Sequence, residues 1–155
     1  MRFGIFISLK HMADSSASRM VLFRLGSACW AAPASEVREV IAAVRPTRIP
    51  GAGDAVAGLV NLRGTLLTVV DGRRAMRLDG GSAESESILV LERGGRAYGL
   101  LIDSVLDLVD IPAEELTAGA PPGTRDGRLI RASGRYQGET FAVLDTEALL
   151  APVVD

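Results

Sequence analysis

The chain of 155 residues contains one cysteine, Cys29, and one histidine, His11. A single cysteine excludes a disulfide within the chain, and one residue of each type cannot form a His- or Cys-based metal cluster. We therefore expect neither a metal site nor a cofactor. Cys29 stands beside Trp30 in a strand-like segment with no histidine in the folded part to activate it. We interpret it as a small buried hydrophobe and not as a nucleophile.

Aromatic residues are also scarce, at 5% of the chain, and the arginines of the first half are dispersed. Both features disfavour nucleic-acid binding. The only apolar patch in the first 19 residues, Phe3 to Leu9, is too short to span a bilayer and shorter than a usual signal-peptide core. We expect residues 1–19 to be a disordered leader, a product of an upstream start codon or a tag-like extension. A poor secretion signal is the weaker alternative, and no direct membrane insertion is expected.

Motifs of catalysis are missing as well. The sequence has no GxSxG, Walker or HExxH pattern, and Gly51-Ala52-Gly53 follows a proline instead of a strand. Asp103, Asp107 and Asp110 form an acidic run, which we interpret as a solvated strand face and not as a metal site. General acid–base chemistry would have to rest on scattered carboxylates alone, so the sequence predicts a protein that is not an enzyme.

What is present is a large apolar fraction, 48%, and an uneven distribution of charge. The length suits one compact domain or two very small ones that share a core. Residues 1–77 hold 11 Lys and Arg against 5 Asp and Glu, and residues 78–155 hold 6 against 14. This polarity could orient a partner or a second copy of the chain, or it could reflect two independently solvated surfaces; both interpretations stay open.

The segment from Gly58 to Asp71, GLVNLRGTLLTVVD, is the most informative stretch. It predicts two strands that meet at Arg63-Gly64, with glycine where the chain must reverse. We expect Arg63 to be exposed at the tip. The apolar residues of both strands should lie in the core: Leu59, Val60, Leu62, Leu66, Leu67, Val69 and Val70.

Short strands and turns make up the rest of the chain. We expect hairpins around Gly26-Ser27 and Gly94-Gly95 and further strands in the segments VREVIAAV, SVLDLVDIP and TFAVLD. Residues 54–57 should form a helical turn. One helix should run from a cap at Asp71 to about Leu78, and a second, TEALL, should be capped by Asp145 or Thr146.

The chain also resembles itself. Trp30 aligns with Tyr98, and Val37 with Val105, at a shift of 68; LLTVVDGRRAM aligns with TFAVLDTEALL at a shift of 74. A repeat of a few short strands buries too little surface alone. The sequence therefore predicts an all-β chain with two small barrels that share a central core and leave a groove between them.

GLVNLRGTLLTVVD and RAYGLLIDSVLDLVDIP resemble the central motifs of the CheW family, the coupling proteins of bacterial chemosensory arrays. The resemblance covers about residues 20–151. It implies two SH3-like five-stranded barrels, at about 20–78 and 86–151 within a domain of residues 20–155, with a short helix after the last strand of each. It also implies a non-catalytic, cytoplasmic adaptor that joins a CheA-type histidine kinase to the tips of membrane-bound chemoreceptors and can assemble with other CheW-like domains in rings.

Carried over by position, the resemblance assigns partner contacts to the central hairpin. Arg63 matches the arginine linked to kinase and receptor coupling, and Asn61 and Leu62 precede it in the same NLRG motif. Gly58 matches a glycine whose replacement disturbs coupling, although it could also be a plain strand-entry glycine.

Four more positions are assigned in the same way. Val37 and Glu39 match positions tied to kinase docking, and Gly99 and Val105 match positions tied to receptor contact. Val37 and Val105 could equally be core residues.

The chain departs from the family pattern at Gly72, where leucine is usual and where we expect a loosened helix start. The alternative function is a CheW-like scaffold of a non-flagellar system, such as type IV pilus motility or biofilm signalling. An enzyme is the rival from another class, which turnover of any compound in a small-molecule panel would favour.

Overall fold

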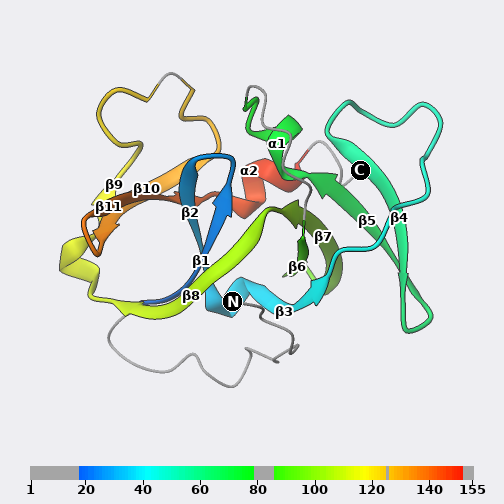
Figure 1. Cartoon of the computed structure of the whole chain (residues 1–155), viewed down its shortest axis with the longest axis horizontal. Coiled ribbons are helices and arrows are strands. Elements are labelled where there is room, and N and C mark those ends of the chain that lie inside the picture. The colour runs from blue at the N-terminus through cyan, green and yellow to red at the C-terminus, as the bar shows by residue number, and fades with distance from the viewer. Residues whose placement is uncertain (1–17, 79–85, 125, 152–155) are drawn as a thin grey trace.

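The computed structural model describes residues 18–78, 86–124 and 126–151 (Figure 1). These residues form eleven strands, which confirms the all-β prediction: β1 (Ser18–Leu25), β2 (Ala28–Pro33), β3 (Val37–Ala42), β4 (Val56–Leu62), β5 (Thr65–Asp71), β6 (Ser87–Arg93), β7 (Arg96–Ile102), β8 (Ser104–Ile111), β9 (Thr117–Ala118), β10 (Ile130–Tyr136) and β11 (Glu139–Leu144). The described helices are short: α1 (Gly72–Ala75), α2 (Thr146–Leu150) and the 3₁₀ turns η2 (Ala34–Glu36) and η3 (Ala113–Glu115). The predicted leader lies outside the described residues except for Ser18 and Arg19, which belong to β1.

The strands form two sheets with the same underlying order. Sheet A runs β8-β1-β2-β11-β10-β9 and sheet B runs β3-β6-β7-β5-β4. The shifts of 68 and 74 residues map β1, β2 and β3 onto β6, β7 and β8, and β4 and β5 onto β10 and β11. Apart from the two-residue strand β9, which makes sheet A six-stranded, the two orders are therefore identical. The internal repeat predicted from the sequence is present in the fold.

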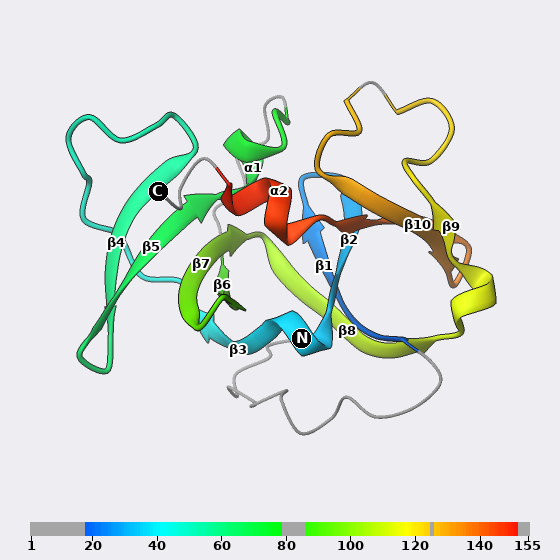
Figure 2. The ribbon, with the colours of Figure 1, turned by 180° about the vertical axis from the view of Figure 1, so that it is seen from behind.

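Each sheet contains strands from both repeats. In sheet B, β5 pairs in parallel with β7, with Thr68 opposite Tyr98; in sheet A, β11 pairs in parallel with β2, with Ala142 opposite Trp30. A parallel pair cannot be closed by a hairpin, so each strand takes its partner from the distant half of the chain. The sheets consequently do not coincide with the continuous ranges 20–78 and 86–151 expected from the sequence. Figure 2 shows the crossing from β7 into β8.

Three apolar clusters hold the sheets together. The largest takes buried residues from both sheets, among them Phe23 and Trp30 of sheet A and Val70 and Leu100 of sheet B, and forms the predicted central core. A second cluster contains residues of sheet A, including Phe141, and a third contains residues of sheet B, including Val69. Cys29 is buried in the second cluster, as expected.

The local predictions are mostly confirmed, with three exceptions. Asp71 and Asp145 cap α1 and α2 with their carboxylates, but α1 ends at Ala75, because Arg77 adopts a left-handed backbone with φ of 56°. Residues 54–57 do not form a helical turn; β4 begins at Val56, which pairs with Val70. Leu66 is not a core residue: its exposed fraction is 63%.

Gly72 has a packing role that the sequence did not reveal. A β-carbon there would lie 2.6 Å from the carbonyl oxygen of Leu101 and 2.9 Å from a methyl carbon of Leu25. The first residue of α1 therefore touches both the end of β7 and the end of β1. The sequence predicts that Gly72 loosens the helix start. In the structure, Gly72 instead allows α1 to pack closely at the junction of the two sheets.

The Gly72→Ala variant should be less stable than the wild type. The added methyl group has backbone on one side and a fully buried leucine on the other, so we expect a loss of about 1–3 kcal/mol in the free energy of unfolding, measured by urea denaturation. Gly53→Ala is the matched control, because its β-carbon meets no atom within 4 Å. Equal stability of the two variants would contradict this packing.

A second prediction concerns Glu139 of β11, which accepts two hydrogen bonds from Arg24 of β1 at 2.8 and 3.1 Å. These hydrogen bonds are the main reason that the pKa of Glu139 is lowered, and the positive charge of Arg24 lowers it further. A carboxyl group whose pKa is lowered by folding stabilises the folded state at pH values above its unfolded-state pKa. This contribution is lost as the pH falls through the folded-state pKa. In Arg24→Gln, a carboxyl NMR titration should show the Glu139 pKa shifted upward. Arg135→Gln, which removes a guanidinium from the same hairpin, should leave it unchanged.

Candidate functional site

The tip of the β4–β5 hairpin is a rigid, exposed turn. Arg63 and Gly64 both have positive φ values, 49° and 88°, as in the tight turns that join antiparallel strands. The side-chain oxygen of Asn61 accepts a hydrogen bond of 2.8 Å from the amide of Gly64. The Arg63 side chain is 58% exposed, as predicted. Asn61 thus holds the turn, and the turn presents Arg63.

Arg63 forms an ion pair with Glu39 of β3. A guanidinium nitrogen donates to one Glu39 carboxylate oxygen at 2.5 Å, and Glu39 is buried, with an exposed fraction of 4%. The other carboxylate oxygen, Oε1, is buried and has no hydrogen-bond partner among the described residues. Burial of a carboxylate is costly unless it is paired, so Arg63 compensates the charge of Glu39. The structure therefore brings these two predicted residues together as one unit.

A β-bulge places Glu39 within reach of the hairpin. The register between β3 and β6 shifts between Val37 and Glu39, so that Val37 lies opposite Leu91 and Glu39 opposite Val90. Val37 belongs to the central core, whereas Val90 belongs to the cluster of sheet B. Since β3 and β4 are the two edges of sheet B, the ion pair links a strand at one edge to the hairpin tip at the other.

The other sheet has an equivalent contact of different chemistry. Asp107 of β8 and the turn at Gln137-Gly138 occupy the positions of Glu39 and Arg63-Gly64 in the repeat. Here the Tyr136 hydroxyl donates a hydrogen bond of 3.0 Å to Asp107, which raises the pKa of Tyr136. One sheet is thus fastened by an arginine at its hairpin tip and the other by a tyrosine beside its tip.

Leu66 adds exposed apolar surface to the hairpin. It lies directly opposite Asn61 across the hairpin, and Leu62, next to Arg63, is half-buried. We call Asn61, Leu62, Arg63 and Leu66 the hairpin surface. The sequence prediction missed Leu66 because its apolar character and strand position are those of a core residue. The hairpin extends beyond the core, as Figure 1 shows, and this cannot be inferred from a strand pattern.

Gly58 shapes this surface without belonging to it. A β-carbon at Gly58 would lie 2.2 Å from the carbonyl oxygen of Thr47, and its φ is 144°. The neighbouring Leu59 exchanges two backbone hydrogen bonds with Thr47, each 2.8 Å long. Gly58 therefore allows the loop before β4 to pair with the edge of the hairpin.

The remaining predicted site residues lie away from the tip. Val37 is 1% exposed, and a β-carbon at Gly99 would lie 3.0 Å from methyl groups of Ile88 and Val69. Both positions are interior. Val105 is half-buried against the central core, and its neighbour Leu106 is 44% exposed. Of these three, only Val105 reaches the surface, and its role stays a prediction.

The groove in the structure lies against sheet A and the end of α1. Its described lining includes no strand residue of sheet B, so it is not the groove between the two barrels that the sequence predicted, and none of the predicted site residues lines it. Its apolar lining includes Trp30 and Phe141 of sheet A, Met76 and Leu78 after α1, and Leu129 before β10.

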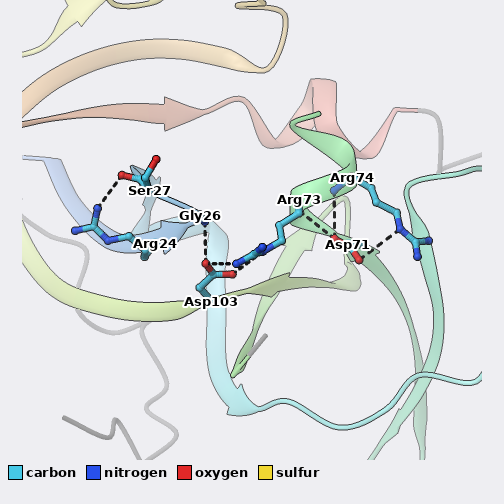
Figure 3. A network of polar contacts seen from close by, with 7 residues as sticks. All are labelled: Arg24, Gly26, Ser27, Asp71, Arg73, Arg74 and Asp103. Atoms are coloured by element: carbon cyan, nitrogen blue, oxygen red, sulfur yellow. Dashed lines mark hydrogen bonds and ion pairs between the residues drawn. The ribbon is translucent and has the colours of Figure 1, made fainter. Parts of the chain in front are cut away.

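Asp103 departs from the sequence interpretation. Figure 3 shows its carboxylate between the β1–β2 turn and α1, where it binds the backbone amide of Gly26 and the guanidinium of Arg73. Its side chain is only 12% exposed, so it is not part of a solvated strand face. The signal missed was that Asp103 stands at the crossing between two sheets.

The charge polarity of the sequence becomes a polarity in space. The described segments that build sheet B, 37–78 and 86–102, hold nine arginines and five carboxylates. Those that build sheet A, 18–36, 103–124 and 126–151, hold five arginines and ten carboxylates. The hairpin surface therefore lies on the basic sheet.

The described part of the chain contains neither a metal cluster nor a membrane-spanning helix. Within residues 18–78, 86–124 and 126–151, no three His, Cys, Asp or Glu side chains are grouped so that they could hold a metal ion. No helix in these same ranges has the length and apolar character needed to cross a membrane.

Comparison with known proteins agrees with this architecture. The chain is 26% identical to a chemotaxis protein CheW of Klebsiella aerogenes over 114 residues, which are 73% of this chain and 69% of the relative. It is 24% identical to a chemotaxis protein CheW of Bacillus subtilis over 149 residues, 90% of this chain and 95% of the relative. It is 32% identical to the protein PilI of Pseudomonas aeruginosa over 105 residues, 64% of this chain and 57% of the relative.

A solved structure supports the fold. The crystal structure of the scaffolding protein TtCheW from Thermoanaerobacter tengcongensis superposes with a TM-score of 0.75 at 22% identity, covering 83% of this chain and 88% of that one. The model of the CheW-like domain matches residues 19–153. With its duplicated strand order and two sheets around a shared core, the chain belongs to the CheW-like domain family of scaffold and adaptor proteins.

Proposed function

We propose that this protein is a non-catalytic adaptor that couples the cytoplasmic tips of chemoreceptors to a CheA-type histidine kinase. The observation that carries the proposal is the hairpin surface, where Arg63 is held over a buried carboxylate on an exposed, rigid turn. Membership of the family supports the adaptor role, and the details of partner and place are part of the proposal.

The chemistry of the hairpin surface suits protein recognition. A guanidinium presents several donors in a planar fork and can bind a carboxylate or carbonyl group of a partner, which lysine cannot do in the same geometry. Leu66 supplies apolar area next to it. Arginine beside an apolar anchor is typical of the few residues that dominate the energy of an interface. Because Glu39 is buried, it acts in docking through Arg63 and not by direct contact.

Two ends of unlike charge suit a protein that joins two others. The hairpin surface lies on the basic sheet, and the equivalent end of sheet A carries Asp107 and Tyr136 on the acidic sheet. Complementary potentials orient partners and suppress wrong ones. The same polarity would allow other CheW-like domains to join the assembly in rings.

We assign the receptor to a separate surface. Val105 and the exposed Leu106 of β8 offer apolar contact for a receptor helix, while Val37 and Gly99 support the strands from within. In this proposal the protein works in the cytoplasm beside membrane-bound receptor arrays and transforms no substrate.

A second candidate is the same adaptor role in a type IV pilus motility system. The 32% identity to PilI of Pseudomonas aeruginosa favours it. The same surfaces would serve, so only the partners separate the two. The kinase and receptor recovered with the protein from its own cells would identify the pathway.

The Arg63→Glu variant should remain folded but be less stable, because it places a second carboxylate beside buried Glu39. It should no longer co-sediment with a kinase–receptor assembly, because it reverses the charge at the hairpin tip. Arg63→Gln, which introduces no new charge beside Glu39, should weaken binding about tenfold or more, as expected for a central interface arginine. Arg96→Glu is the matched control, since Arg96 is exposed near the tip of the β6–β7 hairpin. Unchanged co-sedimentation of both Arg63 variants would remove Arg63 from the interface.

The Leu66→Thr variant should bind the kinase about tenfold more weakly while its urea unfolding midpoint stays the same. Leu66 is 63% exposed, so its loss removes contact area from a partner and not from the core. Val44→Thr, at an apolar residue 51% exposed in the loop before β4, is the control. Added salt should weaken wild-type binding but leave the ratio between wild type and Leu66→Thr constant. A ratio near one would mean that Leu66 does not touch the partner.

A further inference from the structure

The described chain passes from one sheet to the other at two places. It leaves sheet A between β2 and β3 through η2, and it returns from sheet B between β7 and β8 at Asp103. All other described strand connections begin and end in the same sheet. The orientation of the sheets therefore depends on these two crossings and on the core between them.

The β7–β8 crossing is fastened by a partly buried ion pair. Asp103 accepts two hydrogen bonds from Arg73 of α1, at 2.7 and 3.0 Å, and a third from the amide of Gly26 in the β1–β2 turn, at 2.8 Å (Figure 3). The exposed fractions of the two charged side chains are 14% and 12%. The amide of Asp103 also donates to the carbonyl oxygen of Arg24. A single carboxylate thus connects a turn of sheet A to a helix that follows sheet B.

The β2–β3 crossing has a similar contact. Glu36, at the end of η2, accepts a hydrogen bond of 2.6 Å from the hydroxyl of Thr146 in α2. Thr146 is 1% exposed. Since α1 and α2 follow the equivalent strands β5 and β11, each repeat uses the first turn of its helix to reach a carboxylate at a crossing.

Apolar burial is roughly proportional to area and has no direction, whereas a bidentate ion pair is directional. Buried ion pairs often contribute little net stability because desolvation offsets their attraction, and they can instead specify one arrangement. The two contacts lie at the crossings between the sheets, where a directional contact can fix one sheet relative to the other.

We propose that Arg73–Asp103, together with Thr146–Glu36, sets the angle between the two sheets and with it the distance between the hairpin surface and the Asp107–Tyr136 end. These four side chains are positioning residues and touch no partner. The importance of that distance for assembly rests on the proposed adaptor function. The proposal that these contacts set the angle between the sheets does not depend on that function.

The test measures the distance between two spin labels by pulsed dipolar spectroscopy. The labels are placed on cysteines introduced at the exposed residues Thr65 of sheet B and Thr140 of sheet A, in a Cys29→Ala background. Asp103→Asn and Arg73→Gln should each widen the distance distribution at least twofold. Arg73→Lys, which keeps the charge but not the bidentate geometry, should give a smaller increase. Addition of Glu36→Gln to Asp103→Asn should give the widest distribution.

Arg74→Gln is the matched control. Arg74 neighbours Arg73 on α1 and is 58% exposed. It contacts the Asp71 carboxylate at 3.7 Å and the carbonyl oxygen of Asp54 at 3.4 Å, and neither residue lies at a crossing between the sheets. Its distribution should equal that of the wild type. An unchanged width in the combined Asp103→Asn and Glu36→Gln variant, with near-ultraviolet circular dichroism showing a native fold, would overturn the proposal.

Binding separates positioning from simple loss of structure. For Asp103→Asn, the affinity for the kinase alone and for the receptor fragment alone should change less than threefold, while assembly of all three proteins should fall at least tenfold. Equal losses in every assay would contradict a positioning role. A wild-type chain that bound neither partner would refute the adaptor function and leave the spin-label result standing.

Discussion

The structure depends on the exchange of strands between its two repeats. Strand β5 of the first repeat needs β7 of the second as its parallel partner, and β11 needs β2 in the same way. Neither sheet can form from half of the chain. The exchange also places the central core between the sheets, with Phe23 and Leu100 from opposite repeats in one cluster. The protein is therefore one cooperative unit that presents two similar ends, a suitable design for a scaffold protein.

A side-chain contact across each sheet gives the ends their chemistry. In sheet B, a hairpin-tip arginine reaches a carboxylate on a bulged strand at the opposite edge; in sheet A, a tyrosine reaches the equivalent aspartate. The two sheets thus keep the same duplicated architecture, while sheet B is basic and sheet A is acidic. Arg63 both compensates buried Glu39 and remains more than half exposed, so the group that completes the fold is also available for recognition. This dual use explains why both residues belong to the same predicted site although only one faces solvent.

Much of the fold could be predicted from the sequence because it depends on local sequence patterns. The hairpin turns follow from glycine positions, the helix caps Asp71 and Asp145 follow from capping chemistry, and the repeat follows from two constant shifts. Features that depend on distant contacts could not be predicted. Leu66 has the pattern of a core residue, and its exposure follows from how far the hairpin extends. Asp103 looks like part of an acidic strand, and its burial follows from α1 packing at the junction, which Gly72 permits.

We propose that the molecule acts by connecting proteins. The most direct measurement is a sedimentation assay that combines this chain with the histidine kinase and a membrane-inserted receptor from the same organism, each present or omitted in turn. The account predicts that kinase sediments with receptor membranes only when the chain is added, and that chain, kinase and receptor are recovered together in a fixed ratio. Sedimentation of kinase that is independent of the chain, or a chain that stays in the supernatant under all conditions, would contradict it.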